Sequence, residues 1–437
     1  MDLSVIIPVA RREHDFKLIK QLREKFKDCE IIIVSDETND FIKSAKLQVN
    51  QLHLVQNSSR AKALNKGANL STSKNLWFLH LDSNIEHIQL PDVMGLDEST
   101  VSTFLLEFDQ ANCWWIAAGA NFRTKTFGIP FGDQSFLMSK KLFNFVGGFN
   151  ENLSLGEDHE FIWRIKSLHI KLNIINKKII TSAIKYKNKK IYQSLKTLWK
   201  TLLQAIKFYQ VKKTIALGVF VKDPHSTESK SRLRETLNNK FVNELNENFI
   251  NITNGNLKRL QQRKKIHFIK VCKDMDEEKL TSFSHMYNGT FINQDQGLNW
   301  IMSDLCKLSL ETVGTVALLG SDIPSLTVDE LDRALSKRLD KSSYFFSTKD
   351  GGFCFMISND EKVIQCLSKV TSSTPSVMKS LTECLYNIEI AKKVFTDVDV
   401  VLDLRKVYEE LKSNETNLSN EQKELLNFLK VNEKSFT

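Results

Sequence analysis

The amino-terminal half of the chain alternates strand-like apolar runs with helical spacing. LSVIIPV at 3–9 predicts a buried strand, apolar residues recur at helical spacing over 15–26, and a short apolar run at 31–34 predicts the next strand. A further helix is expected at 60–69, and WFLHLDSN at 77–84 predicts a third strand that enters an acidic turn. Strand, helix and strand in this order indicate a βαβ beginning and therefore an α/β fold with a parallel sheet.

The same order of patterns begins again near residue 215. IALGVFV at 215–221 and VALLGSDIPSL at 316–326 predict strands that end in polar loops, and SYFFSTKDGGFCFMIS at 343–358 predicts two strands around an acidic turn. Residues 241–300 are expected to be helical with irregular insertions. The sequence therefore predicts two α/β domains joined near residue 210, a repeat of architecture without a fixed sequence period.

Length and composition agree with two domains. The chain has 437 residues, of which 41% are hydrophobic and 26% charged, which is typical of globular proteins and excludes disordered or collagen-like classes. It has no apolar run near the ~20 residues of a membrane span and no signal-peptide pattern. Seven widely spaced cysteines without a C-x-x-C pair favour buried thiols in a reducing cytoplasm. We therefore expect a cytoplasmic protein.

The net charge of +9 comes from one segment. Residues 171–213 contain twelve lysines and no acidic residue, so the rest of the chain is slightly acidic. The chain lacks the interleaved aromatic residues of a nucleic-acid binder, which argues against that class. Residues 191–209 carry a helical apolar stripe with lysines beside it. This helix could contact an anionic membrane peripherally at its inner face, or could pack as a connector between the domains, which a fused chain needs.

Two groups of polar residues in the first half could carry chemistry. Asp82 stands at the end of a predicted strand, with His80 two residues earlier on the same strand face, and such a carboxylate suits Mg²⁺ or Mn²⁺ bound mainly through substrate phosphates. A strand-end aspartate also commonly serves only as a turn residue. Further along, Glu157 and Asp158 stand where a helix is expected to begin, and Asp158 could equally be its N-cap.

In this order, the segments resemble the family 2 glycosyltransferases with the GT-A fold. The resemblance lies in IIPV at 6–9, SSRAKALNKGAN at 58–69, WFLHLDSN at 77–84, GDQSF at 132–136, GGFNE at 147–151, GEDHEFIWR at 156–164 and TSA at 181–183. It covers about residues 1–210 and is similar to a bacterial subgroup with HxD in place of DxD. It implies an enzyme that transfers a sugar from a nucleotide sugar to a hydroxyl acceptor with inversion, assisted by Mg²⁺ or Mn²⁺.

The resemblance also implies roles for single residues. Asp82, with His80, would hold the metal, and Asp158, with Glu157, would deprotonate the acceptor. The donor side would be formed by Pro8, Asp36, Asp40, Arg60, Lys66 and Asp82, and the acceptor side by Gly132, Asp133 and Gln134. Arg11-Arg12 stand where the family usually has Asn-Glu, and residues 35–38 depart from its Asp-Gly-Gly-Ser, so the identity of the donor stays open.

The second half resembles a different family, GT-A-like proteins related to nucleotidyltransferases. The resemblance lies in VKDPHSTESKSRL at 221–233, GSDIPSL at 320–326, KDGGF at 349–353 and TDVDVVLDL at 396–404, and covers about residues 214–410. It implies phosphate contacts for Lys222, Lys230 and Arg232 and a carboxylate site formed by Asp322, Asp350 and Asp399. Residues 411–437 are expected to form a helical tail.

Three departures bear on the activity of the second half. Thr227 replaces a loop glycine, Ser231 replaces threonine and Lys349 replaces an acidic residue. Losing the glycine removes the backbone freedom that helps amides to cradle phosphate. The expected function is therefore glycosyl transfer by the first domain, and the second domain is either a nucleotidyltransferase that makes an activated sugar or a degenerate, non-catalytic domain. The oligomeric state stays open.

Overall fold

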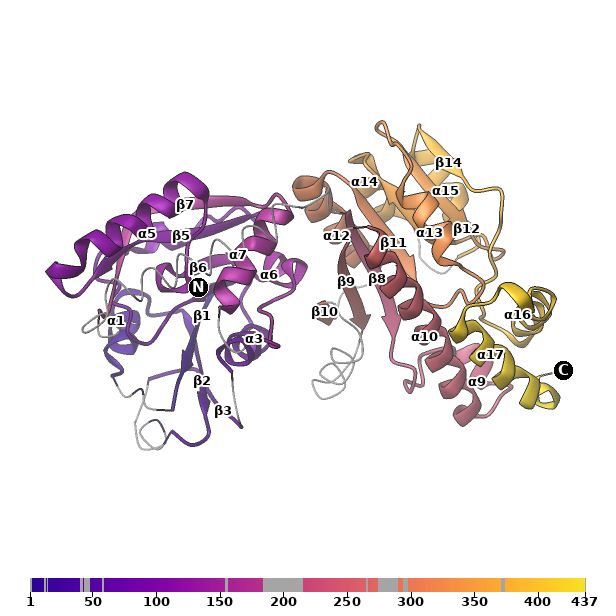
Figure 1. Ribbon diagram of the computed structural model, residues 1–437, viewed down its shortest axis with the longest axis horizontal. Coiled ribbons are helices and arrows are strands. Elements are labelled where there is room, and N and C mark those ends of the chain that lie inside the picture. The colour runs from indigo at the N-terminus through magenta and orange to yellow at the C-terminus, as the bar shows by residue number, and fades with distance from the viewer. Residues whose placement is uncertain are drawn as a thin grey trace. The chain divides into compact units, whose positions relative to one another are not determined.

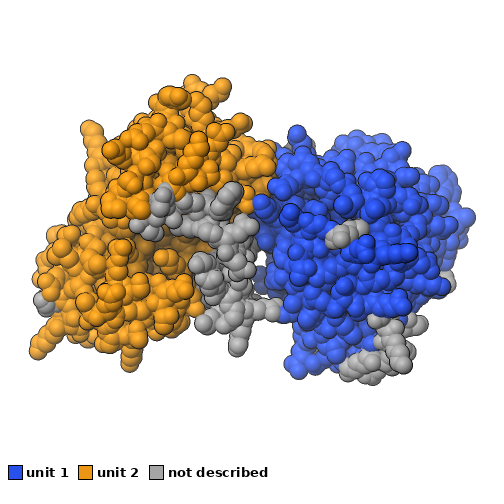
Figure 2. Space-filling model, turned by 180° about the vertical axis from the view of Figure 1, so that it is seen from behind, with its two compact units in different colours: residues 1–211 blue, residues 212–437 orange. Residues whose placement is uncertain are grey.

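The computed structural model divides the chain into two compact units, Met1–Val211 and Lys212–Thr437 (Figure 1). The same division is coloured in a space-filling view (Figure 2). The structure describes residues 2–11, 13, 15–39, 42, 48–56, 59–153, 156–183, 215–264, 266–273, 290–293, 298–370 and 374–436. Arg12, Asp40 and the predicted helix at 191–209 lie outside the described residues.

Unit 1 is built around one mixed sheet. Its strands are β1 (Leu3–Val9), β2 (Glu30–Asp36), β3 (Gln51–Val55), β4 (Asn75–Phe78), β5 (Thr100–Phe108), β6 (Phe136–Ser139) and β7 (Lys171–Thr181). Its helices are α1 (Lys17–Lys25), α3 (Arg60–Leu70), α4 (Leu90–Val93), α5 (Trp114–Phe127), α6 (Lys140–Val146) and α7 (Glu157–Ser167). The strand order is β3-β2-β1-β4-β6-β5-β7.

Only β6 runs against its neighbours in this sheet. Strands β1, β2, β3 and β4 are parallel, with Ile6 of β1 opposite Ile32 of β2 and Phe78 of β4. Strand β6 is antiparallel to both β4 and β5, and β5 is parallel to β7. The carboxyl ends of β1, β2 and β4 therefore meet at one edge, which is where parallel α/β sheets place ligands.

Helices cover both faces of the parallel strands. Val5 and Ile33 belong to the same core cluster as Leu22 of α1. On the opposite face, Ile32 and Val34 pack with Ala63 of α3. Side chains alternate between faces along a strand, so a continuously apolar strand such as β2 needs a helix on each side.

Unit 2 has the same plan. Its strands are β8 (Ile215–Lys222), β9 (Ile266–Lys273), β10 (Thr290–Asn293), β11 (Val316–Gly320), β12 (Ser343–Ser347), β13 (Phe353–Ser358) and β14 (Ile388–Ile390). Its helices are α9 (Ser231–Arg234), α10 (Asn239–Arg263), α12 (Leu298–Val313), α13 (Val328–Leu335), α14 (Lys362–Lys369), α15 (Val377–Cys384), α16 (Val401–Ser413) and α17 (Asn420–Val431).

The two sheets are topological copies of one another. The order of the second is β10-β9-β8-β11-β13-β12-β14, which repeats the first order strand for strand. Strand β13 is the antiparallel one, paired with both β11 and β12, as β6 is in unit 1. The predicted fold class, two GT-A-like α/β units in tandem, is confirmed, including the restart of the same architecture in the second half.

The carboxyl-terminal helices α16 and α17 pack on the long helix α10. Phe241 and Leu245 of α10 share a core cluster with Tyr408 of α16 and Leu425 of α17. Arg259 of α10 pairs with Glu421 at the start of α17, at 3.0 Å between Nη1 and Oε2. In Figure 1 the three helices lie side by side at the end of unit 2 that carries the carboxyl terminus.

Several local expectations need correction. β3 was missed, so β4 is the fourth strand of the chain, and β4 ends at Phe78, before His80 and Asp82. Within 241–300, the strands β9 and β10 were missed beside the expected helix. The prediction of free buried thiols is wrong for Cys366 and Cys384, which form a disulfide between α14 and α15. Strand β3 was missed because its alternation of half-buried and exposed residues extends over only five residues.

Four other cysteines, namely Cys29, Cys113, Cys306 and Cys354, are buried and free. Among the described residues, we find no helix that combines the length and the apolar character of a bilayer-spanning segment.

Candidate active site

Asp158 and Gly132 meet at the start of helix α7. The backbone N–H of Gly132 donates to Asp158 Oδ2 at 2.8 Å, and the N–H of His159 donates to Asp158 Oδ1 at 2.9 Å. The side chain of Asp158 is 17% exposed, so it is largely enclosed yet reachable from solvent. These two donors hold the carboxylate in one orientation and leave each oxygen a further lone pair.

The charge state of Asp158 follows from its surroundings. Burial alone would raise the pKa of this carboxyl, but His159, Arg60 and the Gly132 N–H together outweigh it, so the pKa is lowered below its ordinary value. Asp133 opposes the shift without reversing it. Asp158 is therefore an ionised carboxylate at neutral pH, at the helix end where negative charge is favoured.

Arg60, at the first position of α3, connects Glu157 to His80. Its Nε lies 3.2 Å from Glu157 Oε1, and the Glu157 side chain is only 5% exposed. The guanidinium also contacts His80 Nε2. Arginine can only donate, so Nε2 of His80 is the acceptor and Nδ1 carries the proton, 3.4 Å from Asp133 Oδ1. Both ring nitrogens of His80 are thus engaged with unit 1 side chains.

Gly132 is required by this convergence. A Cβ at Gly132 would lie 2.6 Å from Arg60 Nη2 and 3.1 Å from both Asp158 Oδ2 and His80 Nε2. A real Cβ does not approach a guanidinium so closely, so any side chain here displaces Arg60. Glycine is used at this position because side chains from three segments approach its backbone.

Asp82 stands apart from His80. It is exposed, and its Oδ2 accepts from Thr181 Oγ1 at 3.1 Å, whereas His80 faces Asp133 and Arg60. The expectation that the two residues share one strand face is wrong because β4 ends before them. Over the described ranges, no three His, Cys, Asp or Glu side chains gather as a metal site. The arrangement fits a divalent cation held by one carboxylate and mainly by substrate oxygens.

The acceptor-side segment has a half-buried member, Asp133, and a fully buried one, Gln134. Asp133 faces His80, but Gln134 is fully buried; its Nε2 donates to Phe104 O at 3.0 Å and its Oε1 accepts from Thr124 Oγ1 at 2.8 Å. Gln134 therefore anchors the turn that presents Gly132. Ser135, with φ of 59°, follows in a conformation that L-residues rarely adopt, and its Oγ accepts from the Trp77 indole at 2.8 Å.

The Gly147-Gly148 pair approaches a side chain of the protein itself. Gly148 has a φ of 57°, and a Cβ there would lie 2.8 Å from Asn65 Oδ1. Asn65 of α3 accepts from the Phe149 N–H and donates to Phe149 O, both at 2.8 Å. Arg164 of α7 donates to Gly148 O at 2.7 Å. The glycines therefore join α3 to α7 and so set Arg60 against Glu157.

The sequence did not single out a stack of three side chains behind Asp158. The His159 ring stacks on Phe131, with centroids 3.7 Å apart and planes 17° apart. On Phe131 lies the guanidinium of Arg123 from α5, 3.5 Å from the ring centroid. Cation–π and ring stacking fix His159, whose charge lowers the pKa of Asp158. The only signal for this stack in the sequence was Arg123, a basic residue at helical spacing in α5.

The donor-side residues lie at the carboxyl ends of β1 and β2 and on α3. Asp36 ends β2, and its Oδ1 accepts from the Thr38 N–H at 2.9 Å. Pro8 is near the end of β1, and Lys66 is half-buried on α3. Asp40, a further residue predicted for the donor side, lies outside the described residues.

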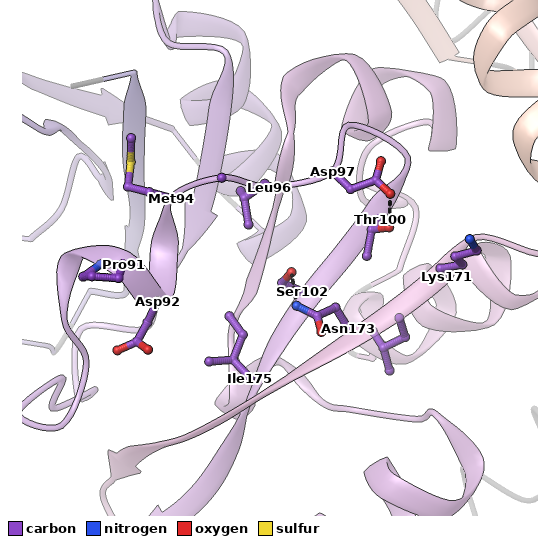
Figure 3. A pocket seen from close by; sticks show the side chains of 12 residues that line it. Pro91, Asp92, Met94, Leu96, Asp97, Thr100, Ser102, Lys171, Asn173 and Ile175 are labelled. Carbon is purple, nitrogen blue, oxygen red and sulfur yellow. Dashed lines mark hydrogen bonds between the residues drawn. The ribbon is translucent and has the colours of Figure 1, made fainter.

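A groove of about 610 Å³ lies at the opposite edge of the sheet, where β5 and β7 begin (Figure 3). Its lining includes Met94, Asp97, Ser102, Lys171 and Asn173. Asn173 Nδ2 donates to Ser102 Oγ at 3.2 Å, and Asp97 accepts from neighbouring residues of its own turn. The groove lies where β5 and β7 begin, and its Asn173, Ser102 and Asp97 side chains form hydrogen bonds within the protein.

Unit 2 brings its predicted residues together around Lys230. Lys230 Nζ lies 2.8 Å from Asp322 Oδ2 and 3.0 Å from Asp399 Oδ1, and the lysine side chain is only 7% exposed. Arg232 is 3.8 Å from Asp399 at the rim. Burial alone would lower the pKa of Lys230, but the two carboxylates outweigh it and raise the pKa above its ordinary value. Lys222 also lowers the pKa of Asp322, behind the larger effect of Lys230.

The carboxylate cluster of unit 2 is crowded. Burial and then the charges of Asp322, Asp350 and Asp399 raise the pKa of Asp397 to about 7, and Lys230 opposes this only in part. Asp350 Oδ1 accepts from the Gly352 N–H at 3.0 Å, so it also shapes its own turn. Asp397 was noted in the sequence but not selected as a site residue. Its signal was the D-x-D spacing with Asp399.

The loop that carries Lys230 has Thr227 at the position where the resemblance predicts a glycine. Thr227 has no positive φ; among the described residues of this loop, Lys230 itself takes the left-handed conformation, at φ of 54°. Arg234 of α9 holds the loop by donating hydrogen bonds to Ser229 O at 2.7 Å and to Pro224 O at 2.9 Å. The loop is therefore ordered by side chains of α9 and its neighbours, with its lysine turned into the carboxylates.

One family model matches part of unit 1. Residues 4–109 match the family model for glycosyl transferase family 2. This stretch runs from β1 to the end of β5 and includes Arg60, His80 and Asp82, and the match supports the expectation of a glycosyltransferase. No curated protein matches the chain.

Two solved structures resemble the chain at low identity. One is a candidate nucleotide-diphospho-sugar transferase from Desulfovibrio desulfuricans G20, with 20% identity and a TM-score of 0.45, covering 52% of this chain and 97% of that one. The other is the mannosyltransferase PcManGT from Pyrobaculum calidifontis in complex with GDP-Man and Mn²⁺, with 13% identity and a TM-score of 0.36, covering 47% of this chain and 64% of that one.

Proposed function

We propose that unit 1 transfers a sugar from a nucleotide sugar to a hydroxyl acceptor with inversion, and that Asp158 is its general base. The observation that carries this proposal is the ionised, nearly enclosed carboxylate of Asp158, held by the Gly132 N–H in the unit whose residues 4–109 match glycosyl transferase family 2. In the reaction, the acceptor hydroxyl oxygen attacks the anomeric carbon, the bond from that carbon to the diphosphate breaks, and the hydroxyl proton passes to Asp158.

Asp133, at the Gly132 turn, would lie on the acceptor side. Glu157 would act by positioning, because its buried carboxylate fixes the Arg60 guanidinium beside the base. On the donor side, Pro8, Asp36, Asp40 and Lys66 would meet the nucleoside diphosphate. Asp82 would hold Mg²⁺ or Mn²⁺ together with the diphosphate oxygens, and such an ion would neutralise charge on the leaving group.

The test begins with donor discovery. Thermal unfolding of the full chain with a panel of nucleoside diphosphate sugars, with and without Mn²⁺, identifies the nucleotide that stabilises it. Release of the nucleoside diphosphate from that donor then measures turnover. We expect Asp158→Asn to lower turnover by about 10²-fold or more and Asp28→Asn, a change at an exposed carboxylate of the same unit, to leave it unchanged. Normal turnover in Asp158→Asn would reject the assignment.

Nucleotidyl transfer by unit 2 is the second candidate. It is favoured by the convergence of Lys230, Asp322 and Asp399 from three separate segments beside the end of β11. Against it stands the ammonium of Lys230, which already pairs with both carboxylates. Pyrophosphate release from nucleoside triphosphates and a sugar phosphate distinguishes this activity from that of unit 1. If no triphosphate is consumed while a nucleotide sugar is, unit 2 is non-catalytic.

A further inference from the structure

Helix α5 exposes large aromatic side chains that a surface helix normally buries. Trp114 is 71% exposed, Phe122 63% and Phe127 55%, and Trp115 is exposed beside them. The residues of α5 that face the core are the small ones, Ala117, Ala120 and Thr124. The polarity of this helix is therefore the reverse of an ordinary amphipathic helix packed on a sheet. Figure 1 shows α5 along the flank of unit 1, beside β5 and β7.

The outward face of α5 is also free of negative charge. From Gln110 to Gly132 the sequence has no acidic residue and two cations, Arg123 and Lys125. The first two-thirds of the helix, up to Phe122, carries no charge at all. Exposed aromatic residues with cations and without acidic residues are the composition of helices that lie in a bilayer interface.

The strand next to β5 extends the positive surface. Strand β7 contributes the lysines Lys171, Lys177 and Lys178 and has no acidic residue. Two carboxylates near the end of β5 are engaged: Glu107 pairs with Lys178 at 2.9 Å, and Asp109 accepts from the Ala183 N–H at 2.8 Å. The flank formed by α5 and β7 is thus complementary to a negatively charged surface.

This flank is tied to the candidate active site. Arg123 of α5 lies on Phe131, Phe131 stacks on His159, and His159 adjoins Asp158. Lys166 of α7 donates to Phe127 O at 2.6 Å, which joins the end of α5 to the helix that carries Asp158. A stack of three side chains therefore connects α5 to the base.

We propose that the outward face of α5, formed by Trp114, Trp115, Phe122 and Phe127 with Lys125, docks unit 1 on an anionic phospholipid surface. The indole and phenyl rings enter the interface, and the cations of α5 and β7 attract the headgroups. A lipid surface fits better than a protein partner because α5 has no acidic residue over its whole length. The proposal concerns binding and does not depend on sugar transfer.

The test is sedimentation of the full chain with vesicles of phosphatidylcholine and phosphatidylglycerol in equal parts, and with phosphatidylcholine alone. We expect binding to the anionic vesicles that weakens with salt. Trp114→Ser with Phe122→Ser should lower the partition coefficient by about tenfold or more, since buried aromatic area is lost. Lys125→Ala should lower it about fivefold, because one cation near an anionic surface contributes on the order of 1 kcal/mol.

The matched control removes exposed apolar side chains from unit 2. Tyr386 is 87% and Val431 85% exposed, and Tyr386→Ser with Val431→Ser should bind vesicles as the unchanged chain does. All these positions are at the surface, and equal thermal unfolding of the variants verifies folding. A blue shift of tryptophan emission on vesicle addition, lost in Trp114→Ser, gives a second readout.

Three results would overturn the proposal. The chain could stay in the supernatant with anionic vesicles at low salt. The α5 variant could bind as strongly as the control, with binding lost instead in Lys196→Glu with Lys200→Glu, which would assign the contact to 191–209. Finally, the α5 variant could change the sedimentation coefficient of the protein without lipid, which would assign the face to a second copy of the chain.

Discussion

The backbone N–H of Gly132 and the carboxylate of Asp158 are joined by a 2.8 Å hydrogen bond, although 26 residues separate them in the chain. The bond links the turn after α5 to the first turn of α7. Arg60 and His80 approach the same glycine from α3 and from the loop after β4. The position of the base thus depends on a residue that has no side chain.

Gly132→Ala is expected to reduce glycosyl transfer by about tenfold or more with a small loss of stability, because its Cβ would displace the Arg60 guanidinium and press on Asp158. Donor turnover and urea unfolding measure the two effects. Gly119→Ala is the control: it lies within α5 with open space around a Cβ, and should stabilise unit 1 by about 0.5–1 kcal/mol. Equal turnover in both variants would contradict the prediction.

The pH dependence of unit 1 follows from Asp158. Its folded-state pKa is lower than the ordinary 3.8, so the carboxylate contributes stability above about pH 4 and loses it as the pH falls through the folded pKa. Turnover should therefore show no titration of Asp158 at neutral pH. The free energy of unfolding should depend less steeply on acid pH in Asp158→Asn than in the unchanged chain. A turnover limb near neutral pH that disappears in Asp158→Asn would refute the lowered pKa.

The sequence predicted which segments form the site but not how they are connected. Motifs at strand and helix ends identify Asp82, Gly132 and Asp158, because parallel α/β topology brings such ends together. The partners of these residues depend on tertiary geometry. That Arg60 would bond Glu157 and His80, and that His80 and Asp82 would face different neighbours, required the actual loop after β4.

The same limit applies to burial. Trp114 and Phe122 would be assigned to a core from composition alone, whereas the structure exposes them and buries Ala117 and Ala120. Helical spacing shows which residues share a face, but which face meets the sheet is decided by how closely α5 approaches β5. The disulfide was missed for a similar reason: Cys366 and Cys384 are 18 residues apart and become neighbours only when α14 packs on α15.

The disulfide should protect unit 2. Cross-linking across a separation of 18 residues is worth about 3 kcal/mol by restriction of the unfolded chain. Reductant, or Cys366→Ser with Cys384→Ser, should lower the urea midpoint of unit 2. Alkylation of the denatured, unreduced protein followed by mass spectrometry checks the pairing directly: the peptides of both cysteines should be unlabelled. Labelling of both would show that the bond does not form.

Lys230→Met tests what the ammonium does in the carboxylate cluster. The variant leaves Asp322 and Asp399 facing one another without the cation between them, so we expect a loss of about 1–3 kcal/mol, moderated by the partial exposure of both carboxylates. It should also raise the affinity of unit 2 for Mn²⁺, measured by titration calorimetry, since an oxygen site is vacated. Lys258→Met, at an exposed lysine of α10 outside the cluster, is the control and should change neither quantity appreciably.

Asp397 gives unit 2 a pH dependence of the opposite sign to that of Asp158. Its pKa of about 7 exceeds the ordinary 3.8, so the folded state binds the extra proton between these values. The stability from Asp397 is complete below about pH 4 and is lost as the pH rises through 7.

Asp397→Asn should therefore change the stability of unit 2 little at low pH and should stabilise unit 2 at pH 8 by on the order of 1–2 kcal/mol, after allowance for solvent screening. Urea unfolding of both proteins across this range is the measurement, and Asp360→Asn, outside the cluster, is the control. A stability difference between Asp397→Asn and the unchanged chain that stays constant from pH 4 to 8 would show that Asp397 is ionised throughout.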